Sequence, residues 1–539
     1  MSKFDRDEER RLEGLSPFEL KNRLIELAGG GERANALAMV NAGRGNPNWT
    51  ATAPREAFFL LGQFAVTETR RDWDEFANLG GMPQSDGIAQ RLDDHLKADA
   101  DAPGAAALAS YVAYGVETLG FEADAWVGEL ADAIIGDHYP VPDRMLAHAE
   151  QVVHAYLDAE MGGAPQGGWD LYAVEGGTAA MCYLFDSAQV NGLLNQGDRI
   201  AIMVPIFTPY LEIPHLQRYE FDIVELKASK DTAEGLHTWQ YPDAEIDKLK
   251  DPSIKALFLV NPSNPPSVKL AETTLERIRD IVAEDNPGLT IITDDVYGTF
   301  TNGFTSLMSS QASNTIGVYS FSKYFGCTGW RLGVIAVARD NVFDKRIAAL
   351  DEAHTAVLRE RYSSITLEPS KLRFIDRIVA DSRDVALNHT AGLSTPQQVQ
   401  MVLFSLHTLT DAEGAYKRDC QAIIARRLKA LVEGLDVPYP DDPEAANYYV
   451  ELDLLSWATR NWGAEFADWM QGNFEPVDPI FRLAEEESVV LLNGGGFDGP
   501  QWSVRVSLAN LRMDAYQRIG AALRTIGDEY HDAFQKQRR

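Results

Sequence analysis

The sequence predicts an α/β fold built on a doubly wound, mostly parallel sheet. From Leu171 onward, short apolar runs alternate with helical patterns, and each run ends in polar, glycine or proline residues. Strands of this kind, separated by helices, are typical of parallel sheets that helices cover on both faces. Ligands bind such sheets beyond the carboxyl ends of the strands. The polar residues at these ends are therefore the candidates for a functional site.

The elements follow in order along the chain. Residues 55–135 carry Ala and Leu at three- and four-residue spacing between Gly, Pro and Asp breaks, which predicts a helical region. The expected strands are LYAV (171–174), RIAIMV (199–204), KALFLV (255–260), LTIIT (289–293), TIGVYS (315–320) and RLGVIAVA (331–338). A long helical stretch begins with LSTPQQVQMVLFSLHTL (393–409), and NYYVELDLL (447–455) and WSVRVSLANL (502–511) are expected strands of a second sheet.

Composition and charge exclude several classes of function. The chain has 539 residues and a formal net charge of -31, which repels both phosphate backbones and anionic lipid surfaces. We therefore expect no nucleic acid partner and no membrane association. Its three cysteines are far apart in the sequence, so neither a disulfide framework nor a metal site is expected. The charged N-terminus lacks an apolar signal region, and a cytoplasmic location is predicted.

The ends of the first predicted strands offer groups that suit a phosphorylated aromatic ligand. Gly176, Gly177 and Thr178 open a helix after the first strand, and free N–H groups at a helix start bind phosphate. After the second strand, Phe207 or Tyr210 is placed to lie against an aromatic ring.

The ends of the later strands supply groups for chemistry on that ligand. Asn264, in NPSNPP, can donate a hydrogen bond to a ring hydroxyl. Asp294 can keep a pyridine nitrogen protonated, and Tyr297 follows three positions later. Lys323, in SFSKYFGCTGWRLG, is the one residue of this series that can form a Schiff base.

Each of these residues, taken singly, has an ordinary structural explanation. NPSNPP can be a turn, Asp294 a helix cap, Phe207 a core aromatic, and Lys323 or Arg331 a solvated surface residue. The order of the series favours function instead, because phosphate loop, stacking aromatic, asparagine, aspartate, lysine and arginine follow one another strand by strand.

These motifs resemble those of fold-type I pyridoxal 5'-phosphate (PLP) enzymes, the aspartate aminotransferase superfamily. SFSKYFGCTGWRLG is the most specific of them, NPSNPP and DDVY support it, and the match runs from about Asn41 to the last fifth of the chain. The resemblance implies that Lys323 is the catalytic residue and carries PLP. It also implies a set of cofactor-binding residues, namely Gly176, Gly177, Thr178, Ser320 and Arg331 at the phosphate and Phe207, Asn264, Asp294 and Tyr297 at the ring.

The resemblance extends to substrate binding and to assembly. VRVSLANL resembles the segment in which the family carries the arginine that binds the substrate α-carboxylate, here Arg505. NAGRGNPNW (41–49) resembles the loop that closes over the substrate, so Gly45 and Arg44 join Arg505 and Asn264 as expected substrate-binding residues. HYP (138–140) matches the place where the family extends a tyrosine, here Tyr139, to the phosphate of a neighbouring subunit. A homodimer at least, or a larger assembly of dimers, is implied.

Two departures from the usual pattern narrow the family. Residues 51–137 are predicted to be a helical insertion that either covers the site or builds an oligomer interface. NHTAGLSTPQQV (388–399) has Thr390 where dicarboxylate aminotransferases supply an arginine to the distal carboxylate. Together with the chain length and Arg44, these departures resemble the aspartate 4-decarboxylases. That resemblance implies β-decarboxylation of L-aspartate to L-alanine and CO2 through ketimine and enamine intermediates, with side aminotransferase activity and reactivation by an oxo acid such as pyruvate.

Two other functions are weighed against this one. An aminotransferase acting on aspartate or another amino acid is the first alternative. A PLP-fold transcriptional regulator is the second, but the acidic first 150 residues contain no basic recognition helix.

The predicted domain order follows from the same comparison of motifs. Residues 1–50 form an N-terminal arm and part of a small domain, and residues 51–137 form the insertion. Residues 138–390 form the large PLP-binding domain, and residues 391–539 form the small α/β C-terminal domain.

Overall fold

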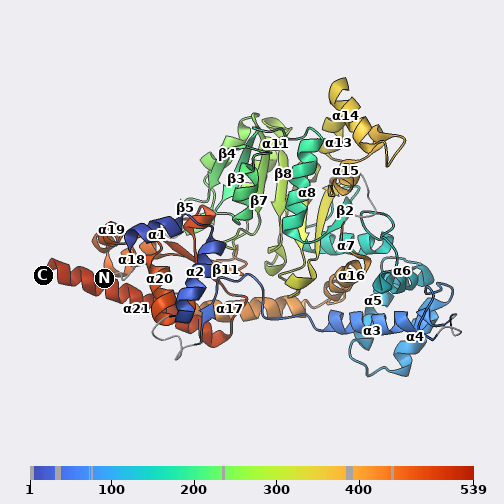
Figure 1. Cartoon of the computed structure of the whole chain (residues 1–539), viewed down its shortest axis with the longest axis horizontal. Helices are drawn as coiled ribbons and strands as arrows, with labels where there is room; N and C mark the ends of the chain where they lie inside the picture. Colours follow the sequence, from blue (N-terminus) through green and yellow to red (C-terminus); the bar gives the residue numbers. More distant parts are fainter. Residues whose placement is uncertain are drawn as a thin grey trace.

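A seven-stranded sheet forms the centre of the molecule (Figure 1). The computed structural model describes residues 5–30, 38–71, 73, 77–232, 237–383, 392–438 and 442–539. In spatial order the strands are β2 (Trp169–Val174), β10 (Gly333–Ala338), β9 (Thr315–Ser320), β8 (Thr290–Asp294), β7 (Ile254–Val260), β3 (Arg199–Val204) and β4 (Asp222–Lys227).

The prediction of a mostly parallel sheet is confirmed. The β3–β4, β3–β7, β7–β8 and β8–β9 pairs are parallel, whereas β10 is antiparallel to both of its neighbours, β2 and β9. Strand β10 therefore begins at the edge where the other six strands end. All the predicted strands of this sheet are present, and β2 begins two residues earlier than predicted.

Alternate residues of the central strands enter two separate hydrophobic cores, as a doubly wound sheet requires. Ile200 and Ile202 of β3 belong to the larger core, which also contains Leu184 of α8 (Gly177–Val190). Met203 belongs to the second core, together with Ile278 of α11 (Glu272–Glu284). Other helices around the sheet are α7 (Ala147–Glu160), α13 (Val342–Ala348), α14 (Glu352–Tyr362), α15 (Phe374–Asp381) and α16 (Thr395–Leu409).

The two ends of the chain meet in a second region (Figure 1). Its antiparallel sheet has the order β11 (Tyr449–Asp453), β14 (Ser503–Ser507), β13 (Leu492–Asn493), and β1 (Val40–Asn41) pairs in parallel with β12 (Val489–Val490). The predicted strands near the C-terminus are thus confirmed. The helices here are α1 (Arg6–Glu13), α2 (Pro17–Gly30), α17 (Ala415–Leu435), α18 (Leu454–Trp462), α19 (Ala464–Asn473), α20 (Asp478–Glu487) and α21 (Met513–Arg538).

The predicted helical region after the N-terminal segment is also confirmed. It contains α3 (Ala53–Thr69), α4 (Ile88–Ala98), α5 (Ala105–Glu117) and α6 (Ala123–Ile135), drawn at the lower right of Figure 1. Helices α3, α5 and α6 pack against one another and against α16. Within the ranges that the structure describes, no helix is long and apolar enough to cross a membrane.

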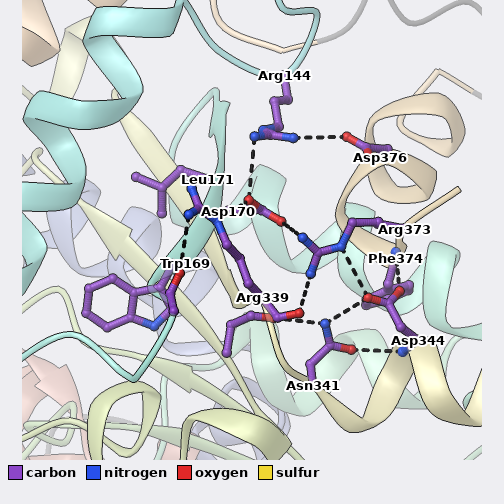
Figure 2. Close-up of polar contacts among 12 residues, drawn as sticks. Arg144, Trp169, Asp170, Leu171, Arg339, Asn341, Asp344, Arg373, Phe374 and Asp376 are labelled. Carbon is purple, nitrogen blue, oxygen red and sulfur yellow. Dashed lines mark hydrogen bonds and ion pairs between the residues drawn. The ribbon is translucent and has the colours of Figure 1, made fainter.

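A network of charges ties the far end of the central sheet to the helices around it (Figure 2). Asp170, at the start of β2, is buried and receives Arg339 Nε at 3.0 Å, Arg144 Nη2 at 3.6 Å and a close contact from Arg373. Arg144 also pairs with Asp376 of α15 at 3.4 Å. Because Arg339 follows β10, the network joins β2, β10 and α15 at the edge of the sheet opposite the glycines that follow β2.

Candidate active site

A cavity of about 320 Å³ lies beyond the carboxyl ends of the strands. It brings together residues that are far apart in the sequence, and eleven of the predicted site residues line it: Gly45, Gly177, Thr178, Phe207, Asn264, Asp294, Tyr297, Ser320, Lys323, Arg331 and Arg505. The remaining lining residues are Phe18, Asn46, Tyr210, Val260, Val296, Ser322, Thr328 and Tyr449. Parallel strand direction explains the convergence, because all but one of these strands end at this edge.

Lys323 points at the loop that contains Gly45. Its Nζ donates a hydrogen bond to the Gly45 carbonyl oxygen at 2.9 Å, and the Tyr448 hydroxyl donates to the same oxygen at 2.9 Å. A Cβ atom on residue 45 would lie 2.5 Å from Tyr449 Oη and 3.0 Å from Lys323 Nζ. Only glycine allows the loop to approach the lysine this closely.

Asp294 is a buried carboxylate at the end of β8. The Tyr210 hydroxyl donates to Asp294 Oδ2 at 2.5 Å, and the Val296 N–H donates to Oδ1 at 3.2 Å. Burial raises the pKa of Asp294, although these two bonds and Lys323 oppose the rise. A cationic group beside this carboxylate would offset its burial.

The start of α8 and the loop after β9 form the other end of the cavity. Helix α8 begins at Gly177, so its first N–H groups have no partner within the helix. Gly176 has φ +93°, and a Cβ atom there would lie 2.7 Å from Arg331 Nη2. Ser320, at the end of β9, is buried and donates to the Ser322 hydroxyl at 2.9 Å. A helix start, hydroxyls and an arginine together suit an anion such as a phosphate.

Arg505 is the deeply buried cation of the cavity, with 1% of its surface exposed. Its Nη1 donates to Asn264 Oδ1 at 3.1 Å and its Nη2 to the Gly43 carbonyl oxygen at 3.1 Å. The guanidinium lies 4.3 Å from the ring centroid of Tyr449 and 4.9 Å from that of Phe497. Neutral acceptors and aromatic faces thus hold the arginine while its charge stays available for a carboxylate.

Two tyrosines of the cavity, Tyr297 and Tyr449, are hydrogen-bonded to each other. The Tyr297 hydroxyl donates to Tyr449 Oη at 3.3 Å. Burial would raise the pKa of Tyr449, but Lys323, Arg505 and the bond from Tyr297 outweigh it and lower this pKa. Burial raises the pKa of Tyr297, which therefore stays a hydrogen-bond donor.

Sequence patterns did not identify Phe18 or Tyr449 as site residues. Phe18, at the start of α2, packs edge-on against Phe207 at 5.9 Å and against Phe497 at 6.1 Å between ring centroids. Tyr449 lies in a strand that was predicted, but without a role in the site. Neither residue belongs to a local motif, so packing between distant segments is the only signal that places them here.

Three predicted site residues do not line the cavity. Gly176 lies next to it, as described above. Arg44 is exposed, and its charge lowers the pKa of Lys21, after burial of that lysine as the main cause. Tyr139 is 65% exposed and lies outside the cavity. Thr390 falls outside the described residues.

The residues of the cavity fit a ligand with a phosphate at one end and a basic ring nitrogen at the other. The glycine at position 176 leaves space beside Arg331 at the start of α8. Asp294 is a buried carboxylate whose hydrogen-bond donors, within the described ranges, are the neutral Tyr210 hydroxyl and Val296 N–H. The Nε atom of Arg505 is buried without a hydrogen-bond partner in the part of the chain that the structure describes. The cavity therefore offers groups that suit a cofactor and a further cationic donor that suits an anionic substrate.

Comparisons with known proteins agree with this geometry. Residues 174–523 match the family model described as aminotransferase class I and II. A bifunctional aspartate aminotransferase and L-aspartate beta-decarboxylase from Pseudomonas sp is 49% identical over 97% of this chain and 98% of that protein. An aspartate aminotransferase from Pinus pinaster is 31% identical over 60% of this chain and 56% of its own length.

Solved structures show the same fold. A double mutant of Thermus thermophilus aspartate aminotransferase superposes with a TM-score of 0.58 at 16% identity, covering 98% of this chain and all of that one. Its maleate complex gives 0.58 at 16% identity and covers 95% and 96%. The sheet order, the cavity and these matches lead to one conclusion: the chain belongs to the aminotransferase class I and II family.

Proposed function

We propose that this enzyme removes the β-carboxylate of L-aspartate as CO2 and releases L-alanine, using PLP, with aminotransferase activity as a side reaction. The observation that carries the proposal is the 49% identity, over nearly the full length of both chains, to a relative named for both activities. The cavity supports it, because a lysine, a buried aspartate and a buried arginine converge there.

The proposed roles of the residues combine the family resemblance with their places in the cavity. Lys323 would carry the cofactor through its amine and move the proton at the substrate α-carbon. Asp294 would pair with the ring nitrogen, and Asn264 and Tyr297 would bind the ring oxygen. Bound PLP would draw electrons from the bonds around the substrate α-carbon. Phe207 would pack against the ring.

The phosphate end of the cofactor is assigned to a separate set of residues. Gly176, Gly177 and Thr178 at the start of α8, with Ser320 and Arg331, would bind the phosphate. Tyr139 of a neighbouring subunit would complete this end, and a homodimer, or an assembly of dimers, is part of the proposal.

Arg505 binds the α-carboxylate, which leaves the β-carboxylate without a matching clamp. Within the described ranges, two arginines line the cavity, Arg505 and Arg331. Arg331 lies at the phosphate end, so it does not bind the β-carboxylate. A carboxylate leaves as neutral CO2 more readily when no fixed cation stabilises its charged form. This arrangement favours decarboxylation over tight dicarboxylate binding.

Arg44 is proposed to admit or position the β-carboxylate without holding it rigidly. It is exposed on the loop that contains Gly45. After burial, its charge is the next cause that lowers the pKa of Lys21. Replacing Arg44 with Ala should raise the KM for aspartate, whereas Arg512→Ala, at an exposed arginine, should not. Unchanged decarboxylation kinetics in Arg44→Ala would remove this role.

A carbon balance tests the main proposal. Purified holoenzyme receives L-aspartate with and without a catalytic trace of pyruvate while CO2, alanine and oxaloacetate are measured together. Equal amounts of CO2 and alanine, sustained by the trace of pyruvate, are expected. Oxaloacetate formed only with a stoichiometric oxo acid would make the protein an aminotransferase instead.

The domain division is proposed with the function. Residues 138–390 would bind the cofactor, and residues 1–50 and 391–539 would form the smaller domain that carries Arg505, although α16 at the start of the second range packs against α7 beside the central sheet. The pairing of β1 with β12 supports this division. None of the described residues of 51–137 lines the cavity, which favours an oligomer interface over an active-site cover for this insertion.

A further inference from the structure

A buried carboxyl lies directly across the strand pair from the buried arginine of the site. Glu451 of β11 and Arg505 of β14 are Cα partners in the antiparallel pair, so their side chains leave the same face of the sheet about 5 Å apart at Cβ. Glu451 is 5% exposed. Its Oε1 accepts a hydrogen bond from the Ser503 hydroxyl at 2.7 Å, and its Oε2 has no partner among the described residues.

The same loop covers both side chains. A Cβ atom at Gly494 would lie 2.4 Å from Glu451 Oε1, and one at Gly499 would lie 2.5 Å from it, so the glycine backbone packs directly on the carboxyl. Phe497 of this loop faces the Arg505 guanidinium. Glu451 and Arg505 are therefore both buried beneath this loop.

Other charges face Glu451 from the neighbouring elements. His237 of β6 (His237–Gln240) accepts or donates a hydrogen bond at 2.7 Å to Asp453, two residues along β11, and also pairs with Asp231 at 2.8 Å. Hydrogen bonding to Asp453 raises the pKa of His237. Burial raises the pKa of Glu451 to about 7, although Ser503, His237 and Arg505 oppose this rise and Asp453 adds to it.

We propose that Glu451 is a proton-dependent counter-ion of Arg505 and takes up a proton when a substrate carboxylate binds. The proposal deepens the function given above and rests on the assignment of Arg505 as the carboxylate-binding residue. Glu451 acts through Arg505 and is a positioning residue. When it is ionised it competes with the substrate for the guanidinium, and when it is neutral it leaves the full charge to the substrate.

The sign of the pH dependence follows from one exchanged proton. Below about pH 7, Glu451 is protonated and substrate carboxylates bind best. Above that pH the proton must be taken from solvent on binding, so the Kd rises by up to about tenfold per pH unit. A purely structural Glu451, needed only to hold the Ser503 loop, would produce neither the proton uptake nor this slope.

Calorimetry on the holoenzyme tests the proposal with succinate, a dicarboxylate without an amine. Titrations at pH 7.5 in two buffers of different ionisation enthalpy give the protons taken up per site, and titrations from pH 6.5 to 8.5 give the slope of Kd. Wild type is expected to take up more protons and to show a steeper slope than Glu451→Gln. Equal proton uptake and equal slopes would overturn the proposal.

Variants of neighbouring residues distinguish the effect of Glu451 from the effects of the groups around it. Asp453→Asn keeps an acceptor for the Ser456 N–H at the start of α18, and because Glu451 is intact it should still take up more protons on succinate binding than Glu451→Gln. If Glu451→Gln does not fold, Ser503→Ala takes its place in the test. The Ser503 hydrogen bond lowers the pKa of Glu451, so its removal should move the onset of the rise in Kd to higher pH. An unchanged onset would overturn the proposal. Succinate binding is independent of which reaction follows, so failure here is distinct from failure of the carbon balance.

Discussion

The neighbours of Arg505 orient its guanidinium and leave its charge free to bind a carboxylate. Its hydrogen bonds go to an amide oxygen and a backbone carbonyl oxygen, and aromatic rings cover its guanidinium. Burial lowers the pKa of Arg505, because the buried guanidinium is poorly solvated. A substrate carboxylate would relieve that unfavourable burial.

Replacing Arg505 with Lys should therefore weaken substrate binding. Lysine keeps the charge but loses the planar pair of donors, and a hydrogen bond to a charged group contributes about 1.5–3 kcal/mol. We expect the KM for aspartate to rise about 10- to 100-fold, measured by steady-state kinetics.

Arg377→Lys is the matched control for this variant. Arg377 is also buried and donates to the carbonyl oxygens of Leu372 and Pro369, but it does not line the cavity. It should lose stability without a change in KM. Equal effects of the two substitutions on KM would argue against a direct role of Arg505.

At the scale of elements, the Asp170 network fixes β2 against β10 and α15 (Figure 2). Replacing Asp170 with Ala removes a buried partner that three partly exposed arginines share, so the free energy of unfolding should fall by about 1.5–3 kcal/mol. Denaturant unfolding measures this, and kcat of the folded variant should stay near wild type because the network is remote from the cavity.

Asp222→Ala provides the comparison for a surface ion pair. Asp222 pairs with Arg199 at 3.1 Å with both side chains largely exposed. Such pairs contribute about 0–1 kcal/mol. A loss for Asp170→Ala no larger than that for Asp222→Ala would show that the network does not hold the sheet together.

A buried acid of α1, Glu9, lies near Asp478, the first residue of α20. Glu9 is 1% exposed beside Asp478, and burial, then Asp478, raise the pKa of Glu9 to about 8 from its ordinary value of 4.5. Because the folded pKa is the higher one, the contribution of Glu9 to stability is full below pH 4.5 and is lost as pH rises through about 8.

Glu9→Gln should reduce this pH dependence. Between pH 6 and pH 9, the fall in Tm is expected to be smaller in Glu9→Gln than in wild type, as measured by differential scanning calorimetry. Glu8→Gln, on the exposed side of α1, should match wild type. A Tm profile of Glu9→Gln that follows wild type would mean that Glu9 does not titrate in this range.

At the scale of the whole molecule, the proposed dimer predicts that each active site uses Tyr139 of the neighbouring subunit. Tyr139 is 65% exposed and does not line the cavity of its own chain, so it can act on a phosphate only in a neighbouring subunit. Mixed dimers of Lys323→Ala and Tyr139→Phe subunits would contain one complete site each.

Activity should therefore reappear when the two inactive or weakened variants are unfolded, mixed and refolded together. Steady-state decarboxylation of the mixture, compared with each variant refolded alone, is the measurement. A mixture no more active than the mean of its components would place Tyr139 outside the neighbouring site.

Local sequence determined the helices and strands and the order of the functional side chains along them. The buried strands are continuous apolar runs with glycine, proline or polar ends, and this pattern is set by residues adjacent in sequence. Parallel strands then bring their ends to one edge, so the positions of Asp294, Asn264 and Lys323 around one cavity were predictable without coordinates.

Only the tertiary structure decided which distant segments complete the cavity. Phe18 comes from α2 and Tyr449 from β11, Glu451 lies beside Arg505 on the same strand pair, and no short motif marks any of them. Their roles depend on packing between the two ends of the chain, through the β1–β12 and β11–β14 pairs. Such contacts are set by register and burial over hundreds of residues, which local patterns do not encode.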